Sequence, residues 1–176
     1  MIISEEYRAL NKALHSADPH WGMSPKWFVE MTGQIADLVK ARTILDYGAG
    51  KQMIEAMLPN LNVTSYDPAI AEIAARPEPA DLLVSGAMLE HVEPDCLDEV
   101  LDDMQRCARL AALISISTFP SSKILADGRN AHLIVKPMDW WLPKLMSRWE
   151  INSAVKISKA FWFFGKAKNV ELHRPQ

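Results

Sequence analysis

The sequence is poor in glycine and cysteine and carries no excess of positive charge. Seven of its 176 residues are glycine, well below the ~7% of an average protein, which excludes a linker-rich or low-complexity chain. The net charge is −3, so the strongly basic surface of a dedicated nucleic-acid-binding protein is not expected. No apolar run approaches the ~18 residues of a membrane span. The hydrophobic fraction of 49% is enough to bury the core of one domain.

The two cysteines, Cys96 and Cys107, lie on one predicted helix. Their spacing corresponds to ~16 Å along a helix axis, far beyond the reach of a disulfide bond, so we expect free thiols. Residues 1–6 are acidic where a secretory signal would be basic. We therefore expect a cytoplasmic protein that does not associate with membranes.

The hydrophobic pattern alternates between short strands and helices. Strands are predicted at 43–46, 63–66, 81–85, 110–118, 151–158 and 161–167, and helices at about 51–58, 94–110 and 137–149. This alternation is typical of an α/β fold with a mostly parallel sheet covered on both faces. The last two strands are joined only by Lys159 and Ala160, which makes that pair antiparallel.

We interpret residues 1–176 as one domain. Residues 1–42 are predicted to form two amphipathic helices, capped by Ser4 and Ser24, that act as a cap or lid over a sheet core of residues 43–176. The apolar run Phe161–Phe164 indicates either a buried strand or a subunit contact. The second alternative would make the protein a homodimer.

The central feature is a glycine turn, Gly48-Ala49-Gly50, that follows Asp46 at the end of a strand. Glycine lets the backbone approach a ligand closely, and the helix that follows offers unpaired N–H groups to negative charge. Asp67 ends the next strand, where a carboxylate can accept both hydroxyls of an adenosine ribose. These features together predict a nucleoside cofactor.

Details of the turn decide between cofactors. A dinucleotide fingerprint requires a third glycine where this chain has Met53. A phosphate-binding P-loop requires Gly-Lys-Ser/Thr, whereas Lys51 is followed by Gln52. Asp46 beside the turn suits a ligand with an ammonium group and no pyrophosphate. A nicotinamide-dependent oxidoreductase is kept as the alternative from another enzyme class.

Three segments resemble motifs of the class I S-adenosylmethionine-dependent methyltransferases. Ile44–Gly50, Tyr66–Pro68 and Asp81–Val92 are similar to the first, second and fourth motifs of that family, and the resemblance extends over about residues 43–118. The segment Ala131–Trp141 is similar to a less regular region of its small-molecule members. The resemblance implies a Rossmann-like methyltransferase fold, S-adenosyl-L-methionine as cofactor and methyl transfer to a small-molecule acceptor.

The resemblance also implies which residues bind the cofactor. Its methionine part would be lined by Asp46, Gly48, Ala49 and Gly50, its ribose held by Asp67, and its sulfonium faced by Ser85, Gly86 and Met88. Because the segment that starts at Pro68 is short, we expect it either to cover the adenine or to leave it partly open to solvent or to a partner subunit. Trp21 precedes the sheet core and belongs either to the core or to a lid that closes over the cofactor.

The segment between the second and third predicted strands is too short for the usual family topology. Only 13 residues, 68–80, separate Asp67 from Asp81, whereas the family usually fits a helix, a strand and another helix there. At ~3.3 Å per extended residue, a strand with its crossovers cannot be built from them. We therefore predict that one edge strand is missing.

His91 and His132 are the candidate catalytic residues. His91 follows a strand end, where parallel sheets place their ligands, and His132 lies in the long polar connection 119–136. Either imidazole could accept the proton of a hydroxyl or amine acceptor. The alternative is that each histidine only forms a hydrogen bond with the loop backbone or faces solvent.

No metal site is predicted. A non-catalytic S-adenosylmethionine-binding module is kept as a further alternative to an enzyme, because the middle of the fold is shortened.

Overall fold

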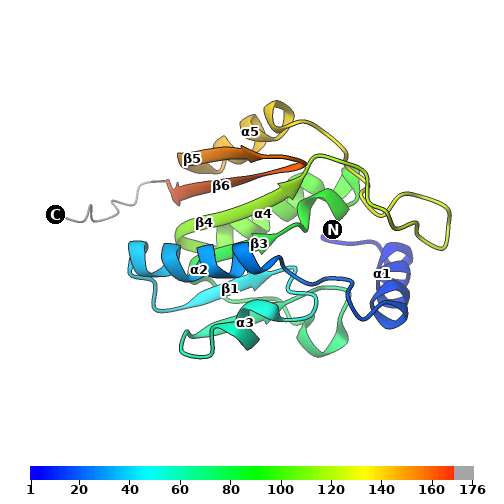
Figure 1. Ribbon diagram of the computed structural model, residues 1–176, viewed down its shortest axis with the longest axis horizontal. Coiled ribbons are helices and arrows are strands. Elements are labelled where there is room, and N and C mark those ends of the chain that lie inside the picture. Colours follow the sequence, from blue (N-terminus) through cyan, green and yellow to red (C-terminus); the bar gives the residue numbers. More distant parts are fainter. Residues whose placement is uncertain (169–176) are drawn as a thin grey trace.

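The computed structural model describes residues 1–168, which form one sheet flanked by helices (Figure 1). Within these residues the strands are β1 (Ile44–Tyr47), β2 (Val63–Tyr66), β3 (Ala80–Gly86), β4 (Ala108–Ser117), β5 (Trp149–Ile157) and β6 (Ala160–Ala167). The α-helices are α1 (Glu5–Ala17), α2 (Lys26–Val39), α3 (Met53–Met57), α4 (Leu97–Cys107) and α5 (Met138–Met146), and the 3₁₀ helices are η1 (Ala71–Ile73), η2 (Leu89–His91) and η3 (Pro94–Cys96). The last eight residues of the predicted domain 1–176 lie outside the described part.

The sheet has the strand order β2-β1-β3-β4-β6-β5. The first four strands in this order pair in parallel, whereas β6 is antiparallel to both β4 and β5. The predicted α/β fold with an antiparallel C-terminal pair is therefore confirmed. β2 is an edge strand of the described sheet, and the chain between β2 and β3 forms only η1. The prediction of a missing edge strand is confirmed as well.

Helices cover both faces of the sheet because its central strands are apolar on both sides. α2 packs on one face, where Phe28 belongs to the same core cluster as Leu82 of β3. α4 and α5 pack on the other, where Leu101 and Trp141 share a cluster with Leu83. Neighbouring residues of one strand thus point into opposite layers, as the twofold period of a strand requires.

Three local details differ from the sequence prediction. Pro25, not Ser24, is the N-cap of α2, and no side chain caps this helix. Trp149 begins β5 instead of ending the preceding helix, because pairing with β6 buries its indole in the core. The hairpin turns at Ser158 and Lys159, one residue earlier than predicted, since Ser158 adopts the left-handed conformation (φ 41°) that tight hairpins favour.

The apolar run Phe161–Phe164 is a buried strand. It belongs to β6, which lies between β4 and β5, and its three phenylalanines are at most 4% exposed. The buried-strand interpretation is confirmed, and no subunit contact is needed to explain the run.

The expectations for the cysteines and for long apolar segments can also be compared with the structure. Cys96 and Cys107 are both free and buried. None of the helices within residues 1–168 combines the length and the apolar character needed to cross a bilayer.

α1 and the loop between β4 and α5 lie at the same end of the sheet, where the parallel strands have their carboxyl ends (Figure 1). This end is where open α/β sheets bind ligands. Ser4 caps α1 as predicted, its side chain accepting from Tyr7 N. Within the predicted cap of residues 1–42, α1 and the segments on either side of it border this end, whereas α2 is part of a core layer. That they act as a lid remains a prediction.

Candidate functional site

The glycine turn is joined to Tyr66 and Asp67 by hydrogen bonds from its main-chain N–H groups. Gly48 N and Ala49 N donate to Tyr66 O, at 2.8 and 3.0 Å. The Asp67 carboxylate accepts from Gly50 N at 3.1 Å and from Ala69 N at 2.9 Å. The ends of β1 and β2 are therefore held together, and each carboxylate oxygen of Asp67 keeps a second lone pair for a ligand.

Both glycines of the turn are required by the backbone. Gly48 and Gly50 have φ angles of 82° and 48°, which residues with a Cβ rarely adopt. A Cβ at Gly50 would lie 2.3 Å from the carbonyl oxygen of Gly22, and one at Gly48 would lie 2.2 Å from Cγ of Met88. The turn is thus covered by the loop after α1 and by the Met88 side chain. The helix after the turn is shorter than predicted, because Gln52 is left-handed and α3 begins at Met53.

A cavity of about 280 Å³ opens beside this turn, between the sheet end and α1. It is bordered by eight of the predicted site residues: Trp21, Gly48, Gly50, Asp67, Pro68, Gly86, Met88 and His91. The sequence reasoning therefore brought together residues from four segments that meet on one cavity.

The other predicted cofactor residues, Asp46, Ala49 and Ser85, lie beneath the cavity wall and do not border it. All three are buried. The Ser85 hydroxyl donates to Tyr47 O at 2.8 Å and so ties β3 to β1. Ser85 thus holds the strands that shape the cavity, whereas the sequence placed it at the sulfonium.

Asp46 is a buried carboxylate that no hydrogen bond satisfies. It is 1% exposed, and neither of its oxygens has a partner among the described residues. Burial raises the pKa of Asp46 to about 7, and the nearby Asp67 and Glu55 carboxylates act in the same direction. A buried carboxylate without a partner is costly, and a positively charged ligand nearby would offset that cost.

The segment after α1 is fastened onto the glycine turn. Lys51 N donates to Gly22 O at 2.9 Å, and the Lys51 ammonium donates to His15 O at 3.0 Å. At the other end of α1, the Ser4 hydroxyl donates to a Glu93 carboxylate oxygen at 2.7 Å. Both ends of the helix are thereby attached to the rim of the cavity.

His91 and His132 lie side by side at the end of β3. Their ring centroids are 4.7 Å apart, and the Trp21 ring lies 4.9 Å from His91. His91 borders the cavity, whereas His132 lies behind it and does not. Burial lowers the pKa of His91 to about 4 and also lowers the pKa of His132, so both rings are neutral at pH 7.

The residues near the cavity that were not predicted as site residues include the ionisable groups of His15 and Glu90. His15 borders the cavity from α1, and burial lowers the pKa of its imidazole. Glu90 is fully buried next to His91, and burial raises the pKa of its carboxyl group to about 7. The only signal for Glu90 was its position beside a candidate histidine. His15 looked like the start of a polar turn segment, whereas it lies in the last turn of α1.

Comparison with known proteins identifies similar structures but no similar sequence. No protein-family model matches the sequence, and no curated protein is significantly similar to it. The 1,6-didemethyltoxoflavin-N1-methyltransferase of Burkholderia thailandensis, solved with 1,6-didemethyltoxoflavin and S-adenosylhomocysteine, aligns with a TM-score of 0.69 and 16% identity over 96% of this chain and 92% of that one.

Two further structures show the range of the similarity. The N-terminal domain of EvdMO1 with bound S-adenosylhomocysteine aligns with a TM-score of 0.54 and 14% identity, over 86% of this chain and 85% of that one. An O-methyltransferase family protein from Burkholderia thailandensis has a TM-score of 0.55 and 14% identity over 82% of this chain, which spans only 58% of that longer protein. At these identities the similarity establishes the fold alone: the chain has the fold of S-adenosylmethionine-dependent methyltransferases.

Proposed function

We propose that this protein is an S-adenosylmethionine-dependent methyltransferase that acts on a small-molecule acceptor. The observation that carries the proposal is the meeting of the glycine turn and the Asp67 carboxylate on one cavity wall, at the carboxyl end of the parallel strands. This is where an α/β sheet binds a nucleoside ligand. The fold similarity to a methyltransferase and to the N-terminal domain of EvdMO1, both solved with S-adenosylhomocysteine, supports the same assignment.

The residues present fit this cofactor. Gly48 and Gly50 border the cavity without a side chain, so a ligand can approach the backbone closely with its methionine part at this turn, with Ala49 between the two glycines. The unpartnered Asp46 carboxylate beneath the turn would favour the cofactor's ammonium group. We assign the ribose to Asp67 and the adenine to the wall that begins at Pro68.

The remaining residues would surround the reacting group. Gly86 and Met88 border the cavity on the side of β3, and Trp21 borders it from the loop after α1. The cofactor, when bound, supplies an electrophilic methyl group on sulfur for in-line transfer. The protein's own contribution would be to orient the acceptor and exclude water, which can provide much of the acceleration in such a displacement. His91 and His132 remain the candidate proton acceptors for a hydroxyl or amine.

A comparison of ligands by thermal unfolding tests the proposal. Because a ligand stabilises only the fold that binds it, S-adenosylhomocysteine at about 100 times its Kd should add roughly 2.7 kcal/mol, which raises the Tm by about 5 to 10 °C in a chain of this size. NADH at the same concentration should leave the Tm unchanged. A rise with NADH alone would instead support the oxidoreductase alternative.

A further inference from the structure

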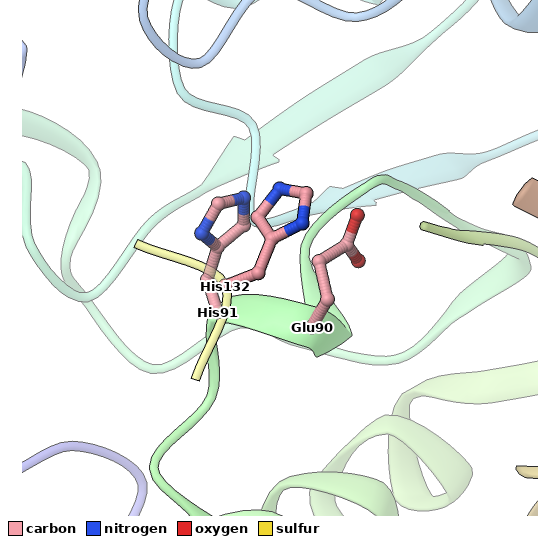
Figure 2. Close-up of side chains that lie close together, drawn as sticks. All are labelled: Glu90, His91 and His132. Carbon is pink, nitrogen blue, oxygen red and sulfur yellow. The ribbon is translucent and has the colours of Figure 1, made fainter. Parts of the chain in front are cut away.

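Three side chains with metal-binding atoms gather at the end of β3 (Figure 2). Glu90 and His91 come from η2, directly after β3, and His132 comes from the loop after β4. One ligand atom from each side chain can be chosen so that all lie within 4.8 Å of one another. Each atom would have to move inward by less than ~1 Å to reach the ~2.1 Å of a zinc–ligand bond.

Main-chain carbonyl groups orient both imidazoles. Nδ1 of His91 lies 2.7 Å from Ala131 O, and Nδ1 of His132 lies 2.6 Å from Phe119 O. Since a carbonyl oxygen can only accept, Nδ1 of each neutral ring carries the proton and Nε2 keeps a free lone pair. Metal-binding histidines are usually held in this way, through the ring nitrogen that does not bind the metal.

Glu90 supplies a buried oxygen that has no hydrogen-bond partner. Its side chain is 0% exposed, and one carboxylate oxygen accepts from Ser117 N at 2.9 Å. The second oxygen has no partner within residues 1–168. An unpaired buried carboxylate oxygen costs free energy, and a cation bound between this oxygen and the two rings would remove that cost.

The segments that carry the cluster are already fastened together. Ile134 N donates to Glu90 O at 3.0 Å, which ties the loop after β4 to η2. Within that loop, the Asn130 side-chain oxygen accepts from His132 N at 2.9 Å and from Ser121 N at 3.0 Å. A ligand set held in this way loses little conformational entropy when an ion binds.

We propose that Glu90, His91 and His132 bind one divalent first-row transition-metal ion such as Zn²⁺. Two imidazoles favour this class over Mg²⁺ and Ca²⁺, which prefer oxygen ligands. Two histidines and one carboxylate are also a ligand set of catalytic zinc sites, which keep a further coordination position open. Because His91 borders the cavity, that open position is accessible to a molecule bound there.

The metal site changes the role of the two histidines. A lone pair that binds an ion cannot accept a proton, so His91 and His132 would orient an acceptor through the ion and would not serve as bases. This role rests on the proposed methyl transfer, whereas metal binding itself does not. Failure to bind a metal would leave cofactor binding untouched, and failure to bind the cofactor would leave the metal site untouched.

Titration of the metal-free full-length protein with Zn²⁺ by calorimetry tests the proposal. We expect one ion per chain for the unmodified protein and no heat with Mg²⁺. His132→Asn, which changes a half-buried loop residue, should weaken Zn²⁺ binding by at least about 100-fold, more than the 10- to 100-fold typical for losing a residue that only supports a ligand. Glu90→Gln keeps the size of the side chain and should weaken binding by at least about tenfold.

The control is His20→Asn, which removes an exposed histidine that borders the cavity but lies outside the cluster and should leave the Zn²⁺ affinity unchanged. Circular dichroism shows whether each variant is folded, and the visible absorption of bound Co²⁺ reports nitrogen and oxygen coordination directly. The proposal is overturned if the unmodified protein binds less than one Zn²⁺ per chain. It is also overturned if folded His132→Asn and Glu90→Gln bind Zn²⁺ as tightly as the unmodified protein.

Discussion

Gly50→Ala is expected to destabilise the protein and to abolish cofactor binding. The added Cβ would lie 2.3 Å from the carbonyl oxygen of Gly22 and 2.8 Å from its Cα. These are backbone atoms, which cannot rotate away as the end of a flexible side chain can. The left-handed backbone costs about 1 to 2 kcal/mol for a residue with a Cβ, and the overpacking adds about 1 to 3 kcal/mol. The Tm measured by circular dichroism should fall by about 10 °C.

Gly128→Ala is the matched control for this substitution. Gly128 also has a positive φ, 88°, but an added Cβ would meet nothing within 4 Å. Gly128→Ala should therefore cost only about 1 to 2 kcal/mol, the penalty for placing a residue with a Cβ in the left-handed conformation. Binding of S-adenosylhomocysteine should be unchanged. If Gly50→Ala were no more destabilising than Gly128→Ala and still bound the ligand, the loop after α1 would not be packed on the glycine turn.

Asp46→Asn is expected to reduce the pH dependence of stability between pH 4 and pH 8. The folded chain raises the pKa of Asp46 from 3.8 to about 7, so the folded state binds this proton more tightly than the unfolded state. The stabilisation that this bound proton gives to the folded state is therefore complete below pH ~4, and it is lost as the pH rises through ~7. The free energy of unfolding should fall by about 4 kcal/mol over this range because of Asp46 alone.

The difference between two urea-unfolding series isolates this contribution. The other buried groups, including Glu90 and His91, titrate in both proteins and cancel when Asp46→Asn is compared with the unmodified protein at each pH. Between pH 4 and pH 8 the free energy of unfolding of the variant should rise by about 4 kcal/mol relative to that of the unmodified protein. Asp37→Asn, which removes an exposed carboxylate, should show no such gain. If the free energies of unfolding of Asp46→Asn and the unmodified protein differed by the same amount at every pH, Asp46 would not be a buried, unpartnered carboxylate.

The sequence was most informative where local chemistry leaves few structural choices. The short strands β1 and β3 carry consecutive apolar residues instead of a strict polar–apolar alternation, which favoured central strands of a covered parallel sheet. The 13 residues from 68 to 80 are too few for a further strand with two crossovers, which made the missing edge strand predictable. The position of Asp67 beside the glycine turn could be predicted because it is set by the ends of two adjacent parallel strands.

The sequence was least informative where a contact joins distant segments. Glu90 was overlooked because its burial depends on Ser117 N, which lies 27 positions away. The position of His132 depends on Phe119 O, and the contact of Gly22 with the glycine turn depends on how α1 is docked. No periodicity or turn preference encodes such pairings. Asp46 lies in β1, two residues before the glycine turn, but its depth beneath the cavity wall follows only from the packed structure.

Binding of the cofactor product is the most direct test of the account. Calorimetric titration of the unmodified protein with S-adenosylhomocysteine should show one site per chain. Asp67→Asn keeps the size of the side chain but removes the charge, and hydrogen bonds to charged groups contribute about 1.5 to 3 kcal/mol. Binding should therefore weaken by at least about tenfold, whereas Glu72→Gln, in the exposed η1, should bind as the unmodified protein does. Absence of binding to the folded, unmodified protein, or equal binding by folded Asp67→Asn, would contradict the proposed cofactor site.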